Sequence, residues 1–256
     1  GLTIFILLNL YLFFEEGKNF YKNYLKIGLS GIIGGSGLGV AMITFIYSIT
    51  NTSAAVTLLC LAAMPFFTAL LAFLFLRERI SFNVWISIIL ASIGILIMAI
   101  GNTGEKSLAG FIFGLTSSIG FSIFSVTLRW KKETPKFTTV AFSGLFCFIF
   151  ASIVILIKDQ VFFASSYNGS LFSLHGTLVC FGLILYSIGS KAIPAAELTL
   201  LSLTEVVGGI FWVWLPIFGI NEVPSTNTII GGFFLFVSLI YYSLIMKWNK
   251  RYIALN

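Results

Sequence analysis

A single acidic side chain, Glu205, lies in the middle of a long apolar run and is the residue of this chain best placed to do chemistry. Ser202 stands three residues before it, and Gly209 and Trp212 stand four and seven residues after it. This spacing places all four residues on one stripe of a helix. The stripe offers a hydroxyl group, a carboxyl group, a gap and an aromatic ring, and it could line a cavity that takes a substrate amine, a transported cation or a proton.

Two interpretations of Glu205 stand side by side. A charged carboxylate in the middle of a membrane helix costs about 2.5 to 3.5 kcal/mol on insertion scales, so it needs contact with protein or water. No Lys or Arg falls inside any predicted span, so no ion-pair partner is evident. The first interpretation is that Glu205 contributes to substrate binding or proton coupling, and the second is that it is a protonated group hydrogen-bonded between helices.

The elements that must position these residues are membrane helices. Hydrophobic residues make up 58% of the chain and charged residues only 9%, and the mean hydropathy is +1.04. No soluble domain of 256 residues needs so much apolar material to fill its core. The apolar runs match helices of about 20 residues and lack the alternation of an outer-membrane barrel. The expected fold class is therefore an all-α integral membrane protein in a lipid bilayer.

Nine transmembrane helices are predicted in the present chain, and ten in a full-length one, because the first apolar run is short and begins without a methionine. The predicted ranges are 1–14, 26–49, 54–76, 81–101, 107–129, 136–157, 171–190, 194–216 and 226–246. On alternate sides of this arrangement, Lys and Arg number thirteen and two. Cytoplasmic loops are enriched in these residues, which predicts a cytoplasmic C-terminus. The net charge of +6 thus reports topology, and no nucleic-acid partner is expected.

Residues 53–78 and 194–222 repeat one design. Each begins near an Ala-Ala pair, passes through Thr-Leu-Leu-x-Leu and ends beyond large apolar residues at a lone Glu. The predicted topology runs the two copies through the membrane in opposite directions. Inverted repeats are common in secondary transporters, whose halves alternate around a site near the membrane midplane. Residues 1–103 and 104–256 are accordingly predicted to be two inverted five-helix repeats, the first without its first helix.

The motifs in these segments resemble those of the drug/metabolite transporter superfamily, and specifically of EamA-like transporters. They are Ala54-Ala55, Met64-Pro65, the Leu-Arg-Glu-Arg-Ile-Ser run at 76–81, Pro194-Ala195-Ala196-Glu197, Leu203-Thr204-Glu205-Val206, Glu222 and Gly231-Gly232. The resemblance implies a ten-helix carrier with a central cavity, both termini in the cytoplasm, and substrates such as amino acids, related metabolites or small drugs. One departure is that Val206 or Val207 replaces the second copy's proline.

Further candidates for the cavity come from four helices. Pro65, at the centre of its predicted helix, is expected to produce a kink and to free a backbone carbonyl for a cavity contact. Ser118 and Ser122 belong to a row of small residues with Gly110 and Gly114, which either packs against another helix or presents hydroxyl groups to the cavity. A second such row is Gly31, Gly35 and Gly39. Tyr47 and Tyr186 are candidate cavity or gate residues, or else packing or interfacial residues.

The charged residues near the helix ends have simpler interpretations. Glu197 is predicted near the cytoplasmic mouth, in the first turn of its helix, where it meets water or Lys191. Glu78, between two arginines, and Glu222 are predicted to be solvated helix ends. Three cysteines fall inside apolar runs and are interpreted as core residues.

The function predicted from these observations is a secondary transporter, working as an exporter of small organic metabolites by alternating access, with proton coupling or exchange. The GxxxxGK[ST] phosphate-binding pattern is absent from the sequence, and His175 and Asp159 are each the only residue of their type. No cofactor, metal site or catalytic residue is therefore predicted. The alternatives are an intramembrane enzyme, or a membrane receptor or scaffold. The expected location is a bacterial inner membrane.

Overall fold

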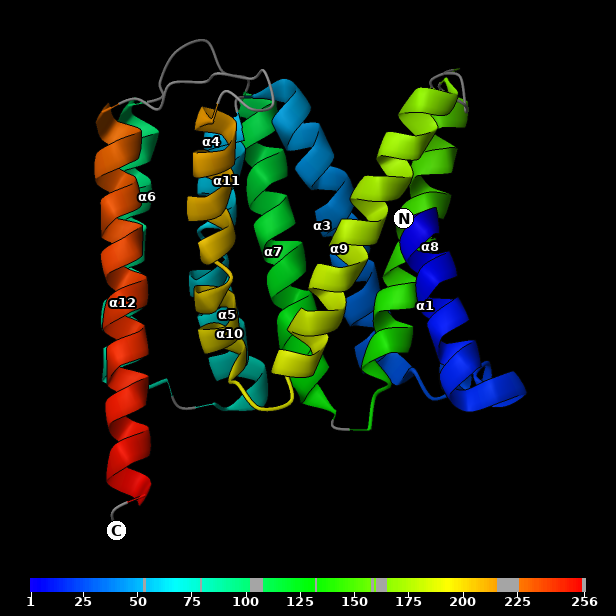
Figure 1. Ribbon diagram of the computed structural model, residues 1–256, viewed down its shortest axis with the longest axis horizontal. Coiled ribbons are helices and arrows are strands. Elements are labelled where there is room, and N and C mark those ends of the chain that lie inside the picture. Colours follow the sequence, from blue (N-terminus) through cyan, green and yellow to red (C-terminus); the bar gives the residue numbers. More distant parts are fainter. Residues whose placement is uncertain are drawn as a thin grey trace.

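The computed structural model describes residues 1–52, 54–78, 80–101, 108–131, 133–157, 159, 165–215 and 226–254, and these form helices with no strand among them (Figure 1). The elements are α1 Leu2–Glu16, η1 Gly17–Asn19, α2 Lys22–Leu25, α3 Gly28–Asn51, α4 Ala54–Leu61, α5 Met64–Leu71, the π-helical turn η2 Ala72–Leu76, α6 Phe82–Gly101, α7 Leu108–Trp130, α8 Lys136–Ile157, α9 Ser166–Gly189, α10 Ala195–Leu201, α11 Thr204–Trp214 and α12 Thr226–Ala254.

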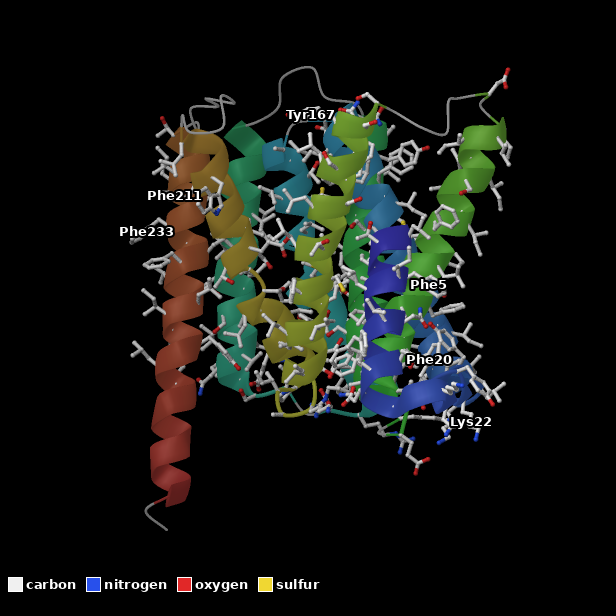
Figure 2. All side chains as sticks on the ribbon, turned by 45° about the vertical axis from the view of Figure 1, so that its right-hand side comes forward. Phe5, Phe20, Lys22, Tyr167, Phe211 and Phe233 are labelled. Carbon is white, nitrogen blue, oxygen red and sulfur yellow. The ribbon has the colours of Figure 1, made fainter. Side chains whose placement is uncertain are left out.

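Apolar side chains cover the outside of this bundle. Phe211 on α11 and Phe233 on α12 project outward and are 50% and 65% exposed (Figure 2). In water such surfaces would associate, whereas lipid tails solvate them. Within the described ranges, four helices, α3, α7, α8 and α9, are long and apolar enough to cross a membrane. The protein is therefore an all-helical integral membrane protein, as the composition predicted.

The helices coincide with most of the predicted spans. The span predicted at 136–157 is α8, and those at 81–101 and 107–129 lie within one residue of α6 and α7. Helix α9 begins five residues before its predicted start, since Ser165 caps it by accepting a hydrogen bond from the Asn168 backbone N–H at 3.4 Å. Helix α12 continues to Ala254, beyond the predicted end at 246.

Two spans predicted as continuous helices are broken in the middle, and here the prediction was wrong. Residues 54–76 form α4 and α5, separated at Ala62 and Ala63, before the π-helical turn η2. Residues 194–216 contain α10 and α11, separated at Ser202 and Leu203. The kink expected at Pro65 is present, but it takes the form of a new helix start.

The buried side chains form two large clusters, and each cluster draws on both halves of the sequence. One joins α5 and α6 to α10, α11 and α12, and the other joins α1 and α3 to α7, α8 and α9. The later helices of each half therefore pack together, as do the earlier ones. Of the cysteines, Cys60 and Cys180 are buried free thiols and Cys147 is a half-buried one, which agrees with their interpretation as core residues.

Small residues allow α3 to approach two neighbours closely. A Cβ atom added to Gly35 or Gly39 would lie 2.5 Å from the ring of Phe142 or Phe146 on α8. On the α7 side, a Cβ atom added to Gly120 would lie 2.6 Å from the Gly37 carbonyl oxygen. Packing is therefore the role of this glycine row, which brings the helix backbones together as membrane interfaces commonly require.

One end of the bundle carries a group of basic residues. The segments that follow η2, α7 and α9 lie at one end, at the bottom of Figure 1. This end carries Arg77, Arg129, Lys131, Lys136 and Lys191, and we refer to it as the basic end.

Candidate functional site

The two broken helices lie against each other in the interior of the bundle. Helix α10 contacts α5, and α11 contacts α4. In Figure 1, α5 and α10 occupy the half nearer the basic end, whereas α4 and α11 occupy the other half. Because α4 precedes α5 and α10 precedes α11, the two broken helices run in opposite directions. Their breaks come at similar depth, which gathers four helix ends into one region.

At the first break, Pro65 stands in the first turn of α5, where its missing N–H costs little. The backbone carbonyls around the break are bound by α7. The Ser118 hydroxyl donates to the Cys60 carbonyl, and the Ser122 hydroxyl donates to the Met64 carbonyl at 3.1 Å. Both serines are fully buried. In the structure, the row of small residues on α7 thus packs on α4 and α5, and the serine hydroxyls give two carbonyls beside the break a donor from another helix.

At the second break, no proline is present, and the groups of this segment form hydrogen bonds with one another. The backbone N–H of Leu203 donates to the Leu200 carbonyl at 3.2 Å, and that of Glu205 donates to the Ser202 carbonyl at 2.9 Å. These are the tight bonds of a 3₁₀ turn. The Ser202 hydroxyl donates to the Thr199 carbonyl of its own helix at 2.7 Å. Ser202 lies in the break itself, so the four-residue stripe predicted for one continuous helix is wrong at this position.

Glu205 stands in the first turn of α11, beside the second break, and its side chain is exposed. Within the part of the chain that the structure describes, no hydrogen bond or ion pair joins its carboxyl group to another residue. The positive end of the helix dipole favours a negative charge at this position. An exposed carboxylate facing lipid tails would be costly, which favours a water-filled space beside it.

The face of α11 beyond Glu205 has little side-chain cover. Trp212, two turns on, is 53% exposed. Between them, a Cβ atom added to Gly208 would meet no atom within 4 Å, whereas one added to Gly209 would lie 3.2 Å from the Leu58 side chain, so the open space is at Gly208. A carboxyl group and an indole ring therefore border an open strip of helix backbone, an arrangement suited to a small solute with a positive group and an apolar part.

The two tyrosines predicted as a pair are separated by the length of the bundle. Tyr47 is near the end of α3 that is remote from the basic end, and its ring lies 5.3 Å from that of Phe113. Tyr186 is near the basic end of α9, where its hydroxyl donates to the Ser125 hydroxyl at 2.7 Å and its ring packs on Phe121 at 5.0 Å. Both rings make packing contacts, and a gate role for either stays a prediction.

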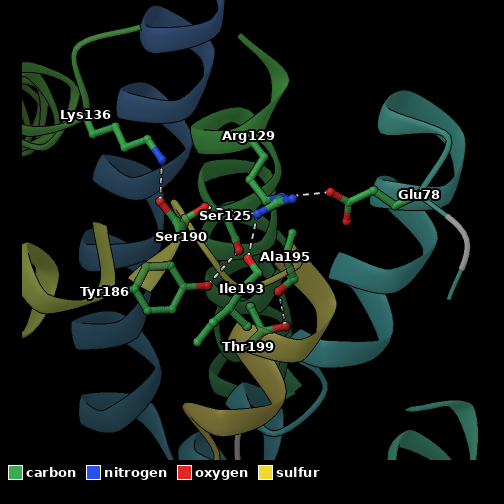
Figure 3. A network of polar contacts seen from close by, with 9 residues as sticks. All are labelled: Glu78, Ser125, Arg129, Lys136, Tyr186, Ser190, Ile193, Ala195 and Thr199. Atoms are coloured by element: carbon green, nitrogen blue, oxygen red, sulfur yellow. Dashed lines mark hydrogen bonds and ion pairs between the residues drawn. The ribbon is translucent and has the colours of Figure 1, made fainter. Parts of the chain in front are cut away.

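A polar network at the basic end was missed by the sequence analysis (Figure 3). Arg129, at the end of α7, forms an ion pair with Glu78 through Nε and Oε1 at 2.8 Å. Its Nη1 donates to the carbonyls of Ser190 and Ile193 at 3.1 and 2.8 Å. Lys136 donates to the Ser190 hydroxyl at 2.9 Å. The network ties the end of the first broken helix to the segment that leads into the second.

Glu78 is therefore not only a solvated helix end, as predicted, but half of an ion pair between distant segments. Glu197 stands in the first turn of α10, as predicted, and its partner among the described residues is Tyr242, not Lys191. The Tyr242 hydroxyl of α12 donates to Glu197 Oε2 at 2.5 Å. The sequence signal for the Arg129 pair was that both residues fall on the same predicted side of the membrane. Glu222 lies outside the described residues.

Comparison with known proteins agrees with the motifs. Residues 1–100 match the sequence model of the EamA-like transporter family. An uncharacterized transporter of Clostridium kluyveri is 26% identical over 234 residues, which cover 87% of this chain and 73% of that protein. An uncharacterized transporter of Helicobacter pylori is 28% identical over 130 residues, which cover 50% of this chain and 42% of that protein. The resemblance to EamA-like transporters of the drug/metabolite transporter superfamily is thereby confirmed, and the protein is a membrane transporter.

Proposed function

We propose that this protein is a secondary transporter that exports small amine-bearing organic solutes, such as amino acids or drug-like amines, across a bacterial inner membrane. The observation that carries the proposal is the Glu205 carboxyl group, which is exposed beside a helix break and has no partner in the described part of the chain. A substrate ammonium group supplies the missing counter-charge. The indole of Trp212 then packs on the apolar part of the solute.

Alternating access is supported by the arrangement of the two broken helices. They run in opposite directions and pack half against half, as expected for inverted repeats at 1–103 and 104–256. The two buried clusters, each built from both sequence halves, can act as two bundles that rock against each other. With the C-terminus in the cytoplasm, the basic end is the cytoplasmic one. The Arg129 network then closes the cytoplasmic side and must open when the solute is taken up from the cell.

The experiment is uptake and counterflow in proteoliposomes that contain the full-length protein. Radiolabelled phenylalanine, leucine and lysine serve as solutes. Phenyllactate serves as the matched competitor, because a hydroxyl group replaces the amine of phenylalanine. We expect saturable flux of at least one amino acid, inhibition by other amine-bearing solutes and no inhibition by phenyllactate. An imposed pH gradient that accelerates flux indicates proton coupling, whereas acceleration only by solute on the opposite side indicates exchange.

The Glu205→Gln variant tests the residue on which the proposal rests. It keeps the shape of the side chain and removes its charge, so we expect flux to fall by about tenfold or more, since a charge-assisted hydrogen bond to substrate is lost. Glu15→Gln removes the same charge from the exposed end of α1 and should transport like the wild type. Equal flux in wild type and Glu205→Gln would refute the role of Glu205, and absence of flux for all amines would refute the substrate class.

A further inference from the structure

A pocket lies at the basic end of the bundle, apart from the open surface beside Glu205. Its volume is about 180 Å³, and it lies between the segment after η2, the end of α7 and the start of α10. Ile80, Val84 and Ala196 give it apolar walls, and Glu78, Arg129 and Glu197 give it three charged groups. An engineered cavity of roughly 150 Å³ is large enough for benzene, so this pocket can hold a ligand portion of about four to eight non-hydrogen atoms.

The charges of this pocket do not balance. Two carboxylates and one guanidinium line it, which leaves one net negative charge (−2 + 1 = −1). The Arg129 guanidinium is engaged by Glu78 and by the carbonyls of Ser190 and Ile193. The Arg129–Glu78 contact is the one ion pair among the described residues, so Glu197 has no cation within the described chain.

Glu197 has spare capacity for a ligand. Its Oε2 accepts the Tyr242 hydroxyl, and its Oε1 has no hydrogen-bond donor in the portion of the chain that is described. The carboxyl group is half-buried, so a cation placed against it would be partly shielded from water. Shielding strengthens the attraction between unlike charges. Beside the charge, the apolar walls offer room for a short carbon chain.

We propose that this pocket binds the primary ammonium group of a small amine, with Glu197 as its counter-ion and Ile80, Val84 and Ala196 around its carbon chain. The proposal rests on the proposed function in one respect, because the amine is the same class of solute that Glu205 binds deeper in the bundle. Eight residues separate the two carboxylates, about 12 Å along a helix. An amine from the cytoplasm thus meets Glu197 first and Glu205 second.

An ammonium group at this depth has two possible sources, a free amine and a lipid head group. The pocket is at the end of the bundle, where lipid head groups lie, and phosphatidylethanolamine presents the same ammonium group as a free amine. The probe is therefore radiolabelled ethanolamine, whose four non-hydrogen atoms fit the volume. Ethylene glycol is its uncharged counterpart, with a hydroxyl group in place of the ammonium group.

The experiment measures equilibrium binding of ethanolamine to the full-length protein in nanodiscs of phosphatidylcholine and phosphatidylglycerol. Glu205→Gln serves as the background, so that the deeper carboxylate does not contribute. We expect saturable binding in this background, no competition by ethylene glycol, and affinity at least about tenfold weaker when Glu197→Gln is added, as expected for loss of a charged partner. Glu15→Gln in place of Glu197→Gln should leave the affinity unchanged.

Two further comparisons keep the outcome decisive. Tyr242→Phe keeps the charge of Glu197 and removes only one hydrogen bond, so binding should stay within about threefold of the background. Nanodiscs with phosphatidylethanolamine should weaken ethanolamine binding if the lipid head group is the occupant, and should leave it unchanged if the occupant is a free solute. The proposal is overturned if ethylene glycol competes equally, or if Glu205→Gln binds ethanolamine as well with Glu197→Gln as without it. Normal transport by Glu205→Gln would refute the deeper site and leave this pocket standing.

Discussion

The two broken helices share one kind of backbone turn but differ in what surrounds it. Both breaks contain tight backbone hydrogen bonds of the same pattern. At the break between α4 and α5, the Ser118 and Ser122 hydroxyls of α7 add hydrogen bonds from another helix, whereas at the break between α10 and α11 the Ser202 hydroxyl donates within its own helix. Next to the first break, Gly114 is in contact with Cys60, whereas next to the second, Gly208 faces open space.

This difference indicates that the two broken helices have different roles, one in stability and one in transport. The first broken helix is fastened to α7 through buried polar contacts, and changes there should alter stability. The second has spare space and a carboxyl group without a partner in the described chain, and changes there should alter transport. Two broken helices of similar design can differ in this way, because one is sufficient to hold the crossing in place while the other takes up ligand chemistry.

The largest expected effect on stability is that of Gly114→Ala. The added methyl group would lie 2.7 Å from Cys60 Cβ and 2.8 Å from its Sγ, so α4 and α7 must move apart. Overpacking of this kind costs about 1 to 3 kcal/mol. We expect a lower free energy of unfolding, measured by chemical denaturation in detergent.

Gly169→Ala serves as the control, because a Cβ atom there would meet no atom within 4 Å. If Gly114→Ala unfolds like the wild type, the first broken helix is not held tightly against α7, and the contrast between the two breaks is lost.

A smaller effect is expected for Ser118→Ala, which removes the hydrogen bond from α7 to the Cys60 carbonyl and leaves that carbonyl only the Ala63 backbone N–H. Hydrogen bonds between membrane helices contribute about 0.6 kcal/mol on average and up to roughly 1.7 kcal/mol. Ser202→Ala is the matched change at the second break, where the hydroxyl donates only to Thr199 of its own helix. The same denaturation experiment should rank Ser118→Ala as the more destabilising of the two. The opposite ranking would mean that the second break depends on its hydroxyl more than the first.

Much of the fold could be predicted from the sequence, because apolar runs bounded by basic residues define membrane helices directly. The run 136–157 has Lys136 at its start and Lys158 just past its end, and α8 spans Lys136–Ile157. The break between α4 and α5 had a local signal, Pro65. The break at Ser202 and Leu203 had none, since both residues are tolerated in a helix and the turn forms in the tertiary context.

The candidate site was harder to predict because its contacts join distant parts of the chain. Arg129 and Glu78 are 51 residues apart, and each resembles an ordinary solvated charge at the end of a span. Ser118 is 58 residues from the carbonyl that it binds, and the spacing of the row on α7 does not indicate which neighbour it faces. Glu205, by contrast, could be identified from the sequence alone. A carboxyl group in the middle of an apolar membrane span is rare and costly, and it therefore indicates a functional site.

A change of favourable sign is expected for Gly208→Ala. Alanine in a helix interior is more favourable than glycine by about 0.8 to 1.0 kcal/mol, and the new methyl group meets no neighbour within 4 Å. The free energy of unfolding should therefore rise slightly. The same methyl group occupies part of the open strip between Glu205 and Trp212, so amino-acid flux in proteoliposomes should fall.

Greater stability with unchanged flux would show that the strip lies outside the solute pathway, and lower stability would show that it is packed against another part of the protein. A rise in stability coupled to a loss of flux is the result that only an open functional surface predicts, because neither a packed helix face nor an idle one gives both.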